Sequence, residues 1–223
     1  MNMKNKQESG DSYLTIQALQ RMPYYLQYLE HAQENGRTEV SASAIAAELG
    51  LNDVLVRKDF AAVCSKKGKP KAGFELDTLI RDIKDYMGYH TLKEAVLVGA
   101  GSLGTALLRN REFEKYGFKI VAAFDSKRSL IHKQISGVEV MSSVRLREFC
   151  RRRNIRIGII TVPAESAQSV ADVLVEGGVR GIWNFALVKL NVPEGVLVQN
   201  EDLACSLAML SQHLRYETAG SEA

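Results

Sequence analysis

The sequence predicts an α/β protein of two units, a small helical unit followed by a parallel sheet with helices on both faces. Three observations favour this fold class. The first 88 residues carry amphipathic helical patterns and no long apolar strand. From residue 94 onward, short apolar segments alternate with helical ones, as in a parallel sheet covered on both sides. A glycine-rich turn joins the first apolar segment to the helix after it.

The composition is that of an ordinary soluble globular protein and gives no sign of a membrane or metal protein. The 223 residues are 46% hydrophobic and 25% charged, which is enough for two small cores. No apolar run approaches the roughly 20 residues that span a bilayer, and the polar residues 1–10 do not resemble a secretory signal. Cys64, Cys150 and Cys205 are too widely spaced for a zinc site or a disulfide framework. We therefore expect a cytoplasmic protein.

The first unit begins with three predicted helices. Apolar residues recur at helical spacing over residues 13–35, and Pro23 inside this pattern indicates either a kink or a helix that starts near Arg21. A second, short helix follows a serine cap, and a third covers residues 53–63 after a turn that contains Gly50. Two short helices around such a turn predict a helix-turn-helix, whose last helix enters a DNA major groove.

A lysine-rich loop follows the third helix. Residues 65–74 contain two glycines and a proline, which preclude a helix and favour a hairpin tip, or wing, beside DNA phosphates. Residues 55–75 carry six basic side chains and two acidic ones, a local charge of +4. The expected DNA-binding residues are Arg57, Lys58, Lys66, Lys67, Lys69 and Lys71. A helix over residues 77–87 then leads to the unit boundary near residue 88.

The second unit is predicted from its alternating pattern. The expected strands are residues 95–99, 118–124, 157–162, 181–185 and 196–198, and the expected helices begin at residue 102 or cover 143–154, 164–176 and 201–216. We therefore predict four segments: a tail at 1–12, a winged helix-turn-helix domain at 13–88, a Rossmann-type domain at 89–200, and a C-terminal helix and tail at 201–223.

The glycine-rich turn predicts a dinucleotide site. The expected cofactor-binding residues at this turn are Gly99, Ala100, Gly101, Ser102, Leu103 and Gly104. The first glycine makes the turn, the second admits the pyrophosphate, and the third lets helix and strand pack closely. Asp125, which ends the next strand, can accept hydrogen bonds from a ribose and repels a 2′-phosphate, so we expect NAD(H) rather than NADP(H). Thr161, Val162 and Pro163 end a later strand at the same sheet edge.

No catalytic residue is evident beside this turn. A dehydrogenase needs a proton donor or acceptor near the nicotinamide, but none of the four histidines follows a predicted strand. A cofactor without a catalyst suggests that the cofactor is a signal.

The chain resembles the Rex family of redox-sensing transcriptional repressors from about residue 19 to residue 214. The matching segments, in order, are Arg21-Met22-Pro23-Tyr24-Tyr25, Val56-Arg57-Lys58-Asp59, the turn at 99–104, Ala123-Phe124-Asp125, Val162-Pro163-Ala164, Asn184-Phe185-Ala186, residues 192–196 and residues 200–203. The resemblance implies operator DNA as a partner, cofactor contacts at Asn184 and Phe185, and a homodimer with a swapped C-terminal helix. It also implies that NAD⁺ permits DNA binding and that NADH releases the DNA.

Two regions depart from the family pattern. In the wing, a family Arg is replaced by Pro70 and a Gly by Lys71, which puts the operator preference in doubt. In the relay that couples cofactor to DNA, the family Asp is present as Asp202, but Gln27 and Asn110 stand where the family has Arg and Tyr. A carboxylate beside Gln lacks the charge-assisted pair that would make the relay strong.

Three alternatives to a redox-responsive repressor therefore stay open from sequence. The first is a Rex-like nucleotide-binding protein with a weak or lost redox response. The second is a small NAD-dependent oxidoreductase, and the third a nucleotide- or CoA-binding subunit of a larger assembly. The helix-turn-helix argues against the last two, because an enzyme has no need of it.

Overall fold

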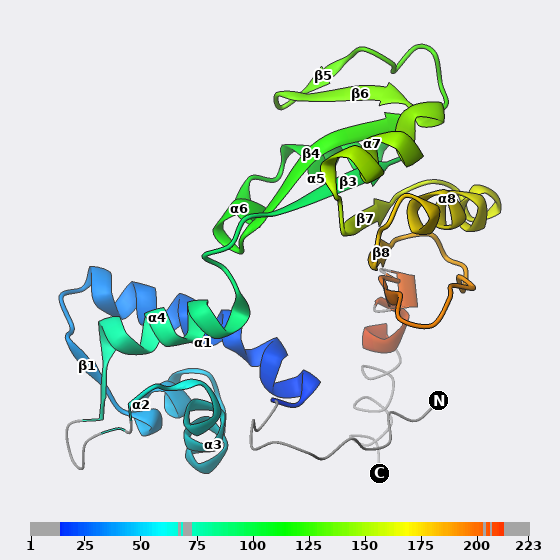
Figure 1. Cartoon of the computed structure of the whole chain (residues 1–223). Coiled ribbons are helices and arrows are strands. Elements are labelled where there is room, and N and C mark those ends of the chain that lie inside the picture. Colours follow the sequence, from blue (N-terminus) through cyan, green and yellow to red (C-terminus); the bar gives the residue numbers. More distant parts are fainter. Residues whose placement is uncertain (1–13, 67, 69–72, 203, 206, 212–223) are drawn as a thin grey trace, which may run out of the picture. The chain divides into compact units, whose positions relative to one another are not determined.

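The chain forms two compact units, residues Met1–Thr91 and Leu92–Ala223 (Figure 1). The computed structural model describes residues 14–66, 68, 73–202, 204–205 and 207–211. The predicted α/β class is confirmed, with a helical unit that precedes a mostly parallel sheet.

The described residues of the first unit form four helices and a two-stranded sheet. Its elements are α1 (Ile16–Glu34), β1 (Glu39–Val40), α2 (Ala42–Glu48), α3 (Asp53–Val63), β2 (Phe74–Glu75) and α4 (Leu76–Met87). The Thr15 side chain caps α1 by accepting from the Ala18 amide. The helix then runs through Pro23, so a helix start near Arg21 was wrong. Buried Ala18 and Met22 anchor the turns before the proline.

The helix-turn-helix is fixed by side-chain caps and a shared core. Ser41 accepts from the Ala44 amide at the start of α2, and Asn52 accepts from the Val54 amide at the start of α3. Buried side chains from α1, α2, α3 and α4 form one hydrophobic cluster. Antiparallel pairing of β1 with β2 forms the base of the predicted wing, and residues 67 and 69–72 of that wing lie outside the described part.

The second unit is a seven-stranded sheet in the order β5-β6-β4-β3-β7-β8-β9. Its strands are β3 (Lys93–Val98), β4 (Phe118–Asp125), β5 (Gln134–Ile135), β6 (Val138–Ser142), β7 (Ile157–Ile160), β8 (Gly181–Asn184) and β9 (Leu197–Asn200). All neighbours pair in parallel except β5 with β6. Counted along the chain, the six parallel strands have the order 3-2-1-4-5-6 of a Rossmann fold, and the topological switch lies between β3 and β7.

Helices cover both faces of this sheet. Val96 and Val98 of β3 point into a cluster with α7 (Leu146–Arg153) and α8 (Ala164–Glu176). Ala95 and Leu97 point into the opposite cluster, which includes side chains of α5 (Ser102–Arg109) and α6 (Glu112–Lys115). This alternation explains why the sequence shows β3 as a continuous apolar run.

Three features of the second unit differ from the sequence prediction. The hairpin β5-β6 was not predicted, because its strands are short and mix polar with apolar residues. The helix expected from residue 143 begins as a 3₁₀ turn at Ser143–Arg145, and α7 starts at Leu146. Of the expected C-terminal helix, residues 204–205 and 207–211 are helical. No described helix combines the length and hydrophobicity needed to span a bilayer.

Candidate functional site

The glycine-rich turn lies at the topological switch of the sheet, between β3 and α5. Gly99 has φ +103°, and a Cβ there would lie 2.7 Å from the Thr161 carbonyl oxygen. A Cβ on Gly104 would overlap the Gly99 carbonyl oxygen. Gly101, by contrast, has nothing within 4 Å of the same position. Gly99 and Gly104 are thus required by the fold, whereas Gly101 faces open space.

Thr161 ties the end of β7 to this turn. Its hydroxyl donates to the carbonyl of Val98 or Gly99, at 3.1 and 2.7 Å, and its amide donates to Val98 at 2.9 Å. Val162 is half-buried and Pro163 is exposed at the N-cap of α8. The sequence placed these three residues at the same sheet edge as the glycines, and they lie there.

Asp125 at the end of β4 also holds the turn. Its Oδ2 accepts from the Ala100 amide at 2.8 Å, and its Oδ1 accepts from the Lys127 amide at 2.8 Å. Sequence reasoning predicted only a ligand role for this carboxylate and did not reveal the bond to Ala100. Each oxygen keeps lone-pair capacity for a further donor.

The start of α5 has the features that a dinucleotide pyrophosphate requires. Gly101 is the N-cap residue, and no side chain caps this end of the helix. Ser102 and Leu103 in the first turn are exposed, so their N–H groups and the helix dipole are open to an anion. The open cradle at Gly101 leaves room for phosphate oxygens, and the residues present therefore fit NAD(H).

Two further expected cofactor residues have structural roles. Asn184 is fully buried, and its amide donates to the Ala186 and Val188 carbonyls and to Asn200 Oδ1 at 2.8–3.1 Å. Its Oδ1 accepts from the Ala186 amide. Phe185 packs on Trp183 with ring centroids 4.6 Å apart. Asn184 thus shapes the loop after β8 rather than presenting free polar groups.

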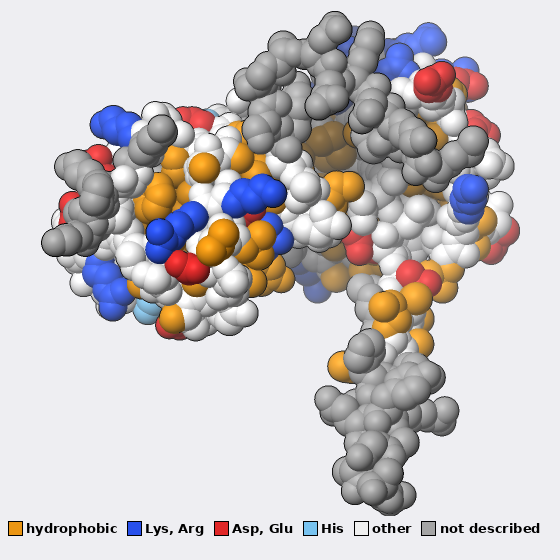
Figure 2. All heavy atoms as spheres, turned by 90° about the horizontal axis from the view of Figure 1, so that it is seen from below, with side chains coloured by type: hydrophobic (Ala, Val, Ile, Leu, Met, Phe, Trp, Pro, Cys, Tyr) orange, Lys and Arg blue, Asp and Glu red, His pale blue; other side chains and the backbone are white. Residues whose placement is uncertain are grey.

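The outer face of α3 carries the expected DNA contacts. Arg57 and Lys58 are exposed, as is Lys66 beyond the helix, and Val54 is 68% exposed. Figure 2, which views the molecule from the side where α2 and α3 lie in Figure 1, shows basic and hydrophobic side chains close together on this unit. Lys67, Lys69 and Lys71 lie outside the described residues.

Arg57 is paired within its own helix. Its Nη2 lies 2.9 Å from Asp53 Oδ2, one turn earlier, and the two side chains are 63% and 42% exposed. Sequence reasoning missed this pair, although acid and base four residues apart on a predicted helix are a recognisable signal.

The inner face of α3 carries a second pair. Asp59 is 3% exposed and accepts from Arg21 through both carboxylate oxygens, at 2.8 and 2.9 Å. The Tyr25 hydroxyl donates to the same carboxylate at 2.8 Å. Burial, with the Asp59 bond as a smaller cause, raises the pKa of Tyr25 to about 12. These bonds attach the recognition helix to α1. They give a structural role to residues 21–25 and 56–59, two of the segments that carry the family resemblance.

The three expected relay residues are divided between the units. Gln27 is exposed on α1. Asn110 Oδ1 accepts from the Glu112 amide, and Asp202 Oδ1 accepts from the Cys205 amide. Asn110 and Asp202 therefore each cap a local turn in the second unit.

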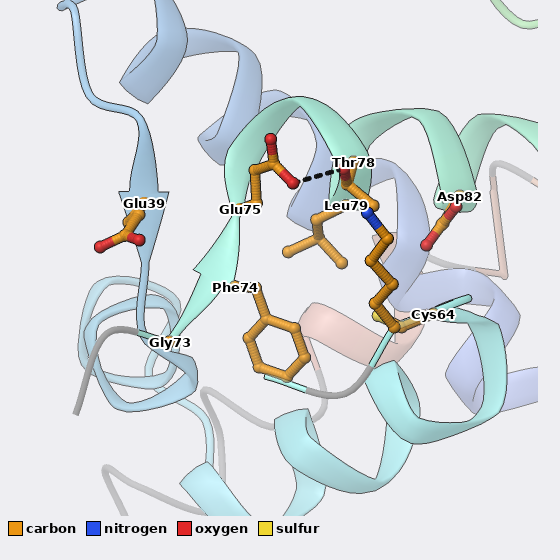
Figure 3. A pocket seen from close by; sticks show the side chains of 9 residues that line it. Glu39, Cys64, Gly73, Phe74, Glu75, Thr78, Leu79 and Asp82 are labelled. Carbon is orange, nitrogen blue, oxygen red and sulfur yellow. Dashed lines mark hydrogen bonds between the residues drawn. The ribbon is translucent and has the colours of Figure 1, made fainter. Parts of the chain in front are cut away.

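A small pocket lies in the helical unit, not at the glycine-rich turn (Figure 3). Its volume is about 120 Å³, below the 300–1,000 Å³ typical of ligand sites. It is lined by Glu39, Cys64, Lys66, Gly73, Phe74, Glu75, Thr78, Leu79 and Asp82. Burial, with a smaller effect of Asp82, raises the pKa of the Cys64 thiol to about 12, so the thiol is unreactive near neutral pH.

Within the described ranges, no group of three His, Cys, Asp or Glu side chains lies close enough together to hold a metal ion.

Family models match both units. The model described as "Putative DNA-binding protein N-terminus" matches residues 16–61, and the model described as "CoA binding domain" matches residues 90–188. Among curated proteins, the chain is 34% identical to the "Redox-sensing transcriptional repressor Rex" of Bacteroides fragilis over 97% of this chain and 98% of that protein. The protein of the same name from Carboxydothermus hydrogenoformans is 40% identical over 88% and 94%.

Solved structures match over almost the whole chain. The crystal structure of RSP in complex with β-NAD⁺ and operator DNA has a TM-score of 0.88 at 30% identity and covers 95% of this chain and 97% of its own. RSP in complex with β-NADH has a TM-score of 0.83 at 30% identity, with coverage of 95% and 99%. A further structure, described as "RSP, a Rex-family repressor", has a TM-score of 0.83 at 29% identity and covers 95% and 98%.

Proposed function

Since the chain belongs to the Rex family of redox-sensing transcriptional repressors, we propose that it represses transcription by binding operator DNA and that NADH releases it from that DNA. One observation carries this proposal. A helix-turn-helix with a basic, exposed recognition helix and a Rossmann turn with an open cradle at Gly101 occur in one chain. The relatives named above match 88–97% of that chain.

The nucleotide is proposed to bind at the β3–α5 turn. The pyrophosphate would lie over Gly101 and accept hydrogen bonds from the first-turn amides of α5. Asp125 would accept hydrogen bonds from the adenosine ribose and also from the Ala100 amide. When bound, the nicotinamide supplies an oxidised and a reduced form of different charge and shape. Residues 161–163 and Phe185 lie at the strand ends where that ring would be sensed.

The DNA contacts are assigned to α3 and the wing. Arg57 and Lys58 would reach base edges, because the exposed face of a recognition helix enters the major groove. Lys66, together with Lys67, Lys69 and Lys71 of the wing, would contact phosphates. Gln27, Asn110 and Asp202 are proposed to form the coupling between the two sites.

The nucleotide is proposed as a signal and not as a substrate. His31 lies in α1, and His90 follows α4. His132 lies in the loop before β5 and pairs with Glu139 of β6. None of these described histidines directly follows a strand of the parallel sheet, where a hydride-transfer acid would be needed. We further propose a cytoplasmic homodimer, paired through the Rossmann domains (89–200) and the C-terminal segment (201–223), with the winged helix-turn-helix domain at 13–88.

The test is a DNA-binding titration in the presence of each nucleotide. A preferred duplex is first selected from a random-sequence pool with the protein saturated by NAD⁺. Its affinity is then measured with saturating NAD⁺, with saturating NADH and without nucleotide. We expect weaker binding with NADH. Equal affinity in all three conditions would contradict redox control, and NADH binding without any DNA binding would contradict the repressor function itself.

A further inference from the structure

We propose that Asp53 is a positioning residue for sequence discrimination, because it holds the Arg57 guanidinium on the reading face of α3. The inference rests on the proposed DNA-binding function and deepens it. It concerns a residue that lies outside the segments on which the family resemblance depends.

The geometry places the carboxylate where DNA would approach. Asp53 is the first residue of α3, and the N-terminal residues of a recognition helix are those that meet base edges. Its Oδ2 lies 2.9 Å from Arg57 Nη2. Val54, Arg57 and Lys58 are exposed beside it, so the acid lies on the exposed face and not behind it.

An acid at this place has a clear electrostatic consequence. DNA phosphates repel a carboxylate, and the repulsion is weakened only while Arg57 neutralises it. The solvent-accessible charges of α3, at 53, 57 and 58, then sum to one positive charge, from two bases and one acid. Arg57 is thereby restrained from binding any nearby phosphate and presents its remaining donors in one direction. Restraint of this kind lowers non-specific affinity and sharpens discrimination between base pairs.

An exposed i,i+4 pair can also serve only to stabilise its helix by a small amount. That role leaves the salt dependence of DNA binding unchanged, because no phosphate contact is gained or lost. The slope of log affinity against log salt therefore separates the two roles.

The experiment compares wild type with Asp53→Asn on the selected duplex and on short random-sequence duplexes, between about 50 and 200 mM salt. We expect Asp53→Asn to bind random duplexes more tightly, by about three- to tenfold at the lower salt, with a slope steeper by about one unit. The ratio of selected-site to random affinity should fall by about fivefold or more.

Glu148→Gln is the matched control. Glu148 and Arg152 form an exposed i,i+4 pair on α7, with Oε1 and Nη1 3.3 Å apart, and the substitution changes the net charge equally. We expect this variant to keep the wild-type slope and ratio. An equal change in both variants would assign the effect to net charge and overturn the proposal.

A double-mutant cycle gives an independent readout. Arg57→Ala removes the guanidinium that Asp53 is proposed to hold, so in that background Asp53→Asn should no longer lower the ratio of selected-site to random affinity. The same fall of this ratio in both backgrounds, or an unchanged slope for Asp53→Asn, would overturn the role of Asp53 while DNA binding itself stands. Failure of the wild type to bind any duplex would overturn the proposed function and this inference with it.

Discussion

The two faces of α3 hold arginine–aspartate pairs under opposite conditions. On the inner face, Arg21 donates to Asp59, a residue that is only 3% exposed, and the Tyr25 hydroxyl donates to the same carboxylate. On the outer face, Arg57 meets Asp53 in solvent. A pair that is shielded from water fixes the position of the helix, whereas a pair in water barely contributes to stability but remains accessible to a ligand.

The glycine-rich turn repeats this division without any charged group. Gly104 faces inward, where the Gly99 carbonyl leaves no space for a side chain, and Gly101 faces outward into open space. Residues of one motif thus divide into those that the packing of the turn requires and those that are proposed to meet the ligand. The division predicts which substitutions affect stability and which affect binding.

The largest expected effect is on the inner pair. Arg21→Ala leaves the Asp59 carboxylate buried beside a single hydroxyl, and we expect the free energy of unfolding of the helical unit to fall by about 3–5 kcal/mol. Asp53→Asn should lower it by no more than about 0.5 kcal/mol. Urea unfolding followed by far-UV circular dichroism measures both. The one tryptophan, Trp183, lies in the sheet unit, and its fluorescence provides the internal control. Similar losses from the two variants would remove the contrast between the faces.

The next effect separates the two glycines. We expect Gly101→Val to reduce NADH affinity by tenfold or more, about 1.4 kcal/mol, with unchanged thermal unfolding, because its branches fill the cradle without touching protein. Gly104→Val should instead destabilise the sheet unit. Calorimetric NADH titration and thermal denaturation of both variants decide the matter. Undiminished NADH affinity in Gly101→Val would place the phosphates elsewhere.

Sequence alone predicted the parts that backbone geometry encodes. Glycine spacing located the turn, because only glycine tolerates φ +103° at 99 and the close approach at 104. Contacts between distant residues were not predictable in the same way. Arg21 and Asp59 lie 38 positions apart, and no local pattern signals that they meet. The bond between Asp125 and Ala100 was missed for the same reason.

A smaller effect is expected at the coupling between the sites. Coupling energies in regulated proteins are typically about 1–3 kcal/mol. In the proposed relay, Gln27 would supply Asp202 with only a neutral donor, so we expect NADH to weaken DNA binding of the wild type by less than about 1 kcal/mol. Gln27→Arg, alone or with Asn110→Tyr, should enlarge the difference. The measurement is DNA affinity at saturating NAD⁺ and NADH for each variant. A strong wild-type response that Gln27→Arg leaves unchanged would show that other residues carry the signal.

A further effect is confined to alkaline pH. The pKa of Cys64 is raised by burial from 9.0 to about 12, so the folded state favours the neutral thiol. Stability from this group is complete below pH 9 and is lost as the pH rises toward 12, because the unfolded thiol ionises first. Cys64→Ala should therefore show a weaker decline in unfolding free energy over this window. Exposed Cys205 offers the control Cys205→Ala, for which we expect the wild-type decline. Identical profiles for all three proteins would contradict the burial of Cys64.

Under the proposed ribose contact, Asp125 has two uses, because it also accepts from the Ala100 amide, and this double use constrains how the protein can evolve. A lineage that came under selection to accept a 2′-phosphorylated nucleotide would have to remove this carboxylate, because its charge repels the phosphate. The same substitution breaks the bond to the Ala100 amide, so the first mutant on that route has a loosened turn as well as an altered preference. Cofactor choice is therefore linked to the integrity of the turn, and a compensating change near Ala100 would have to come before or together with the loss of the acid.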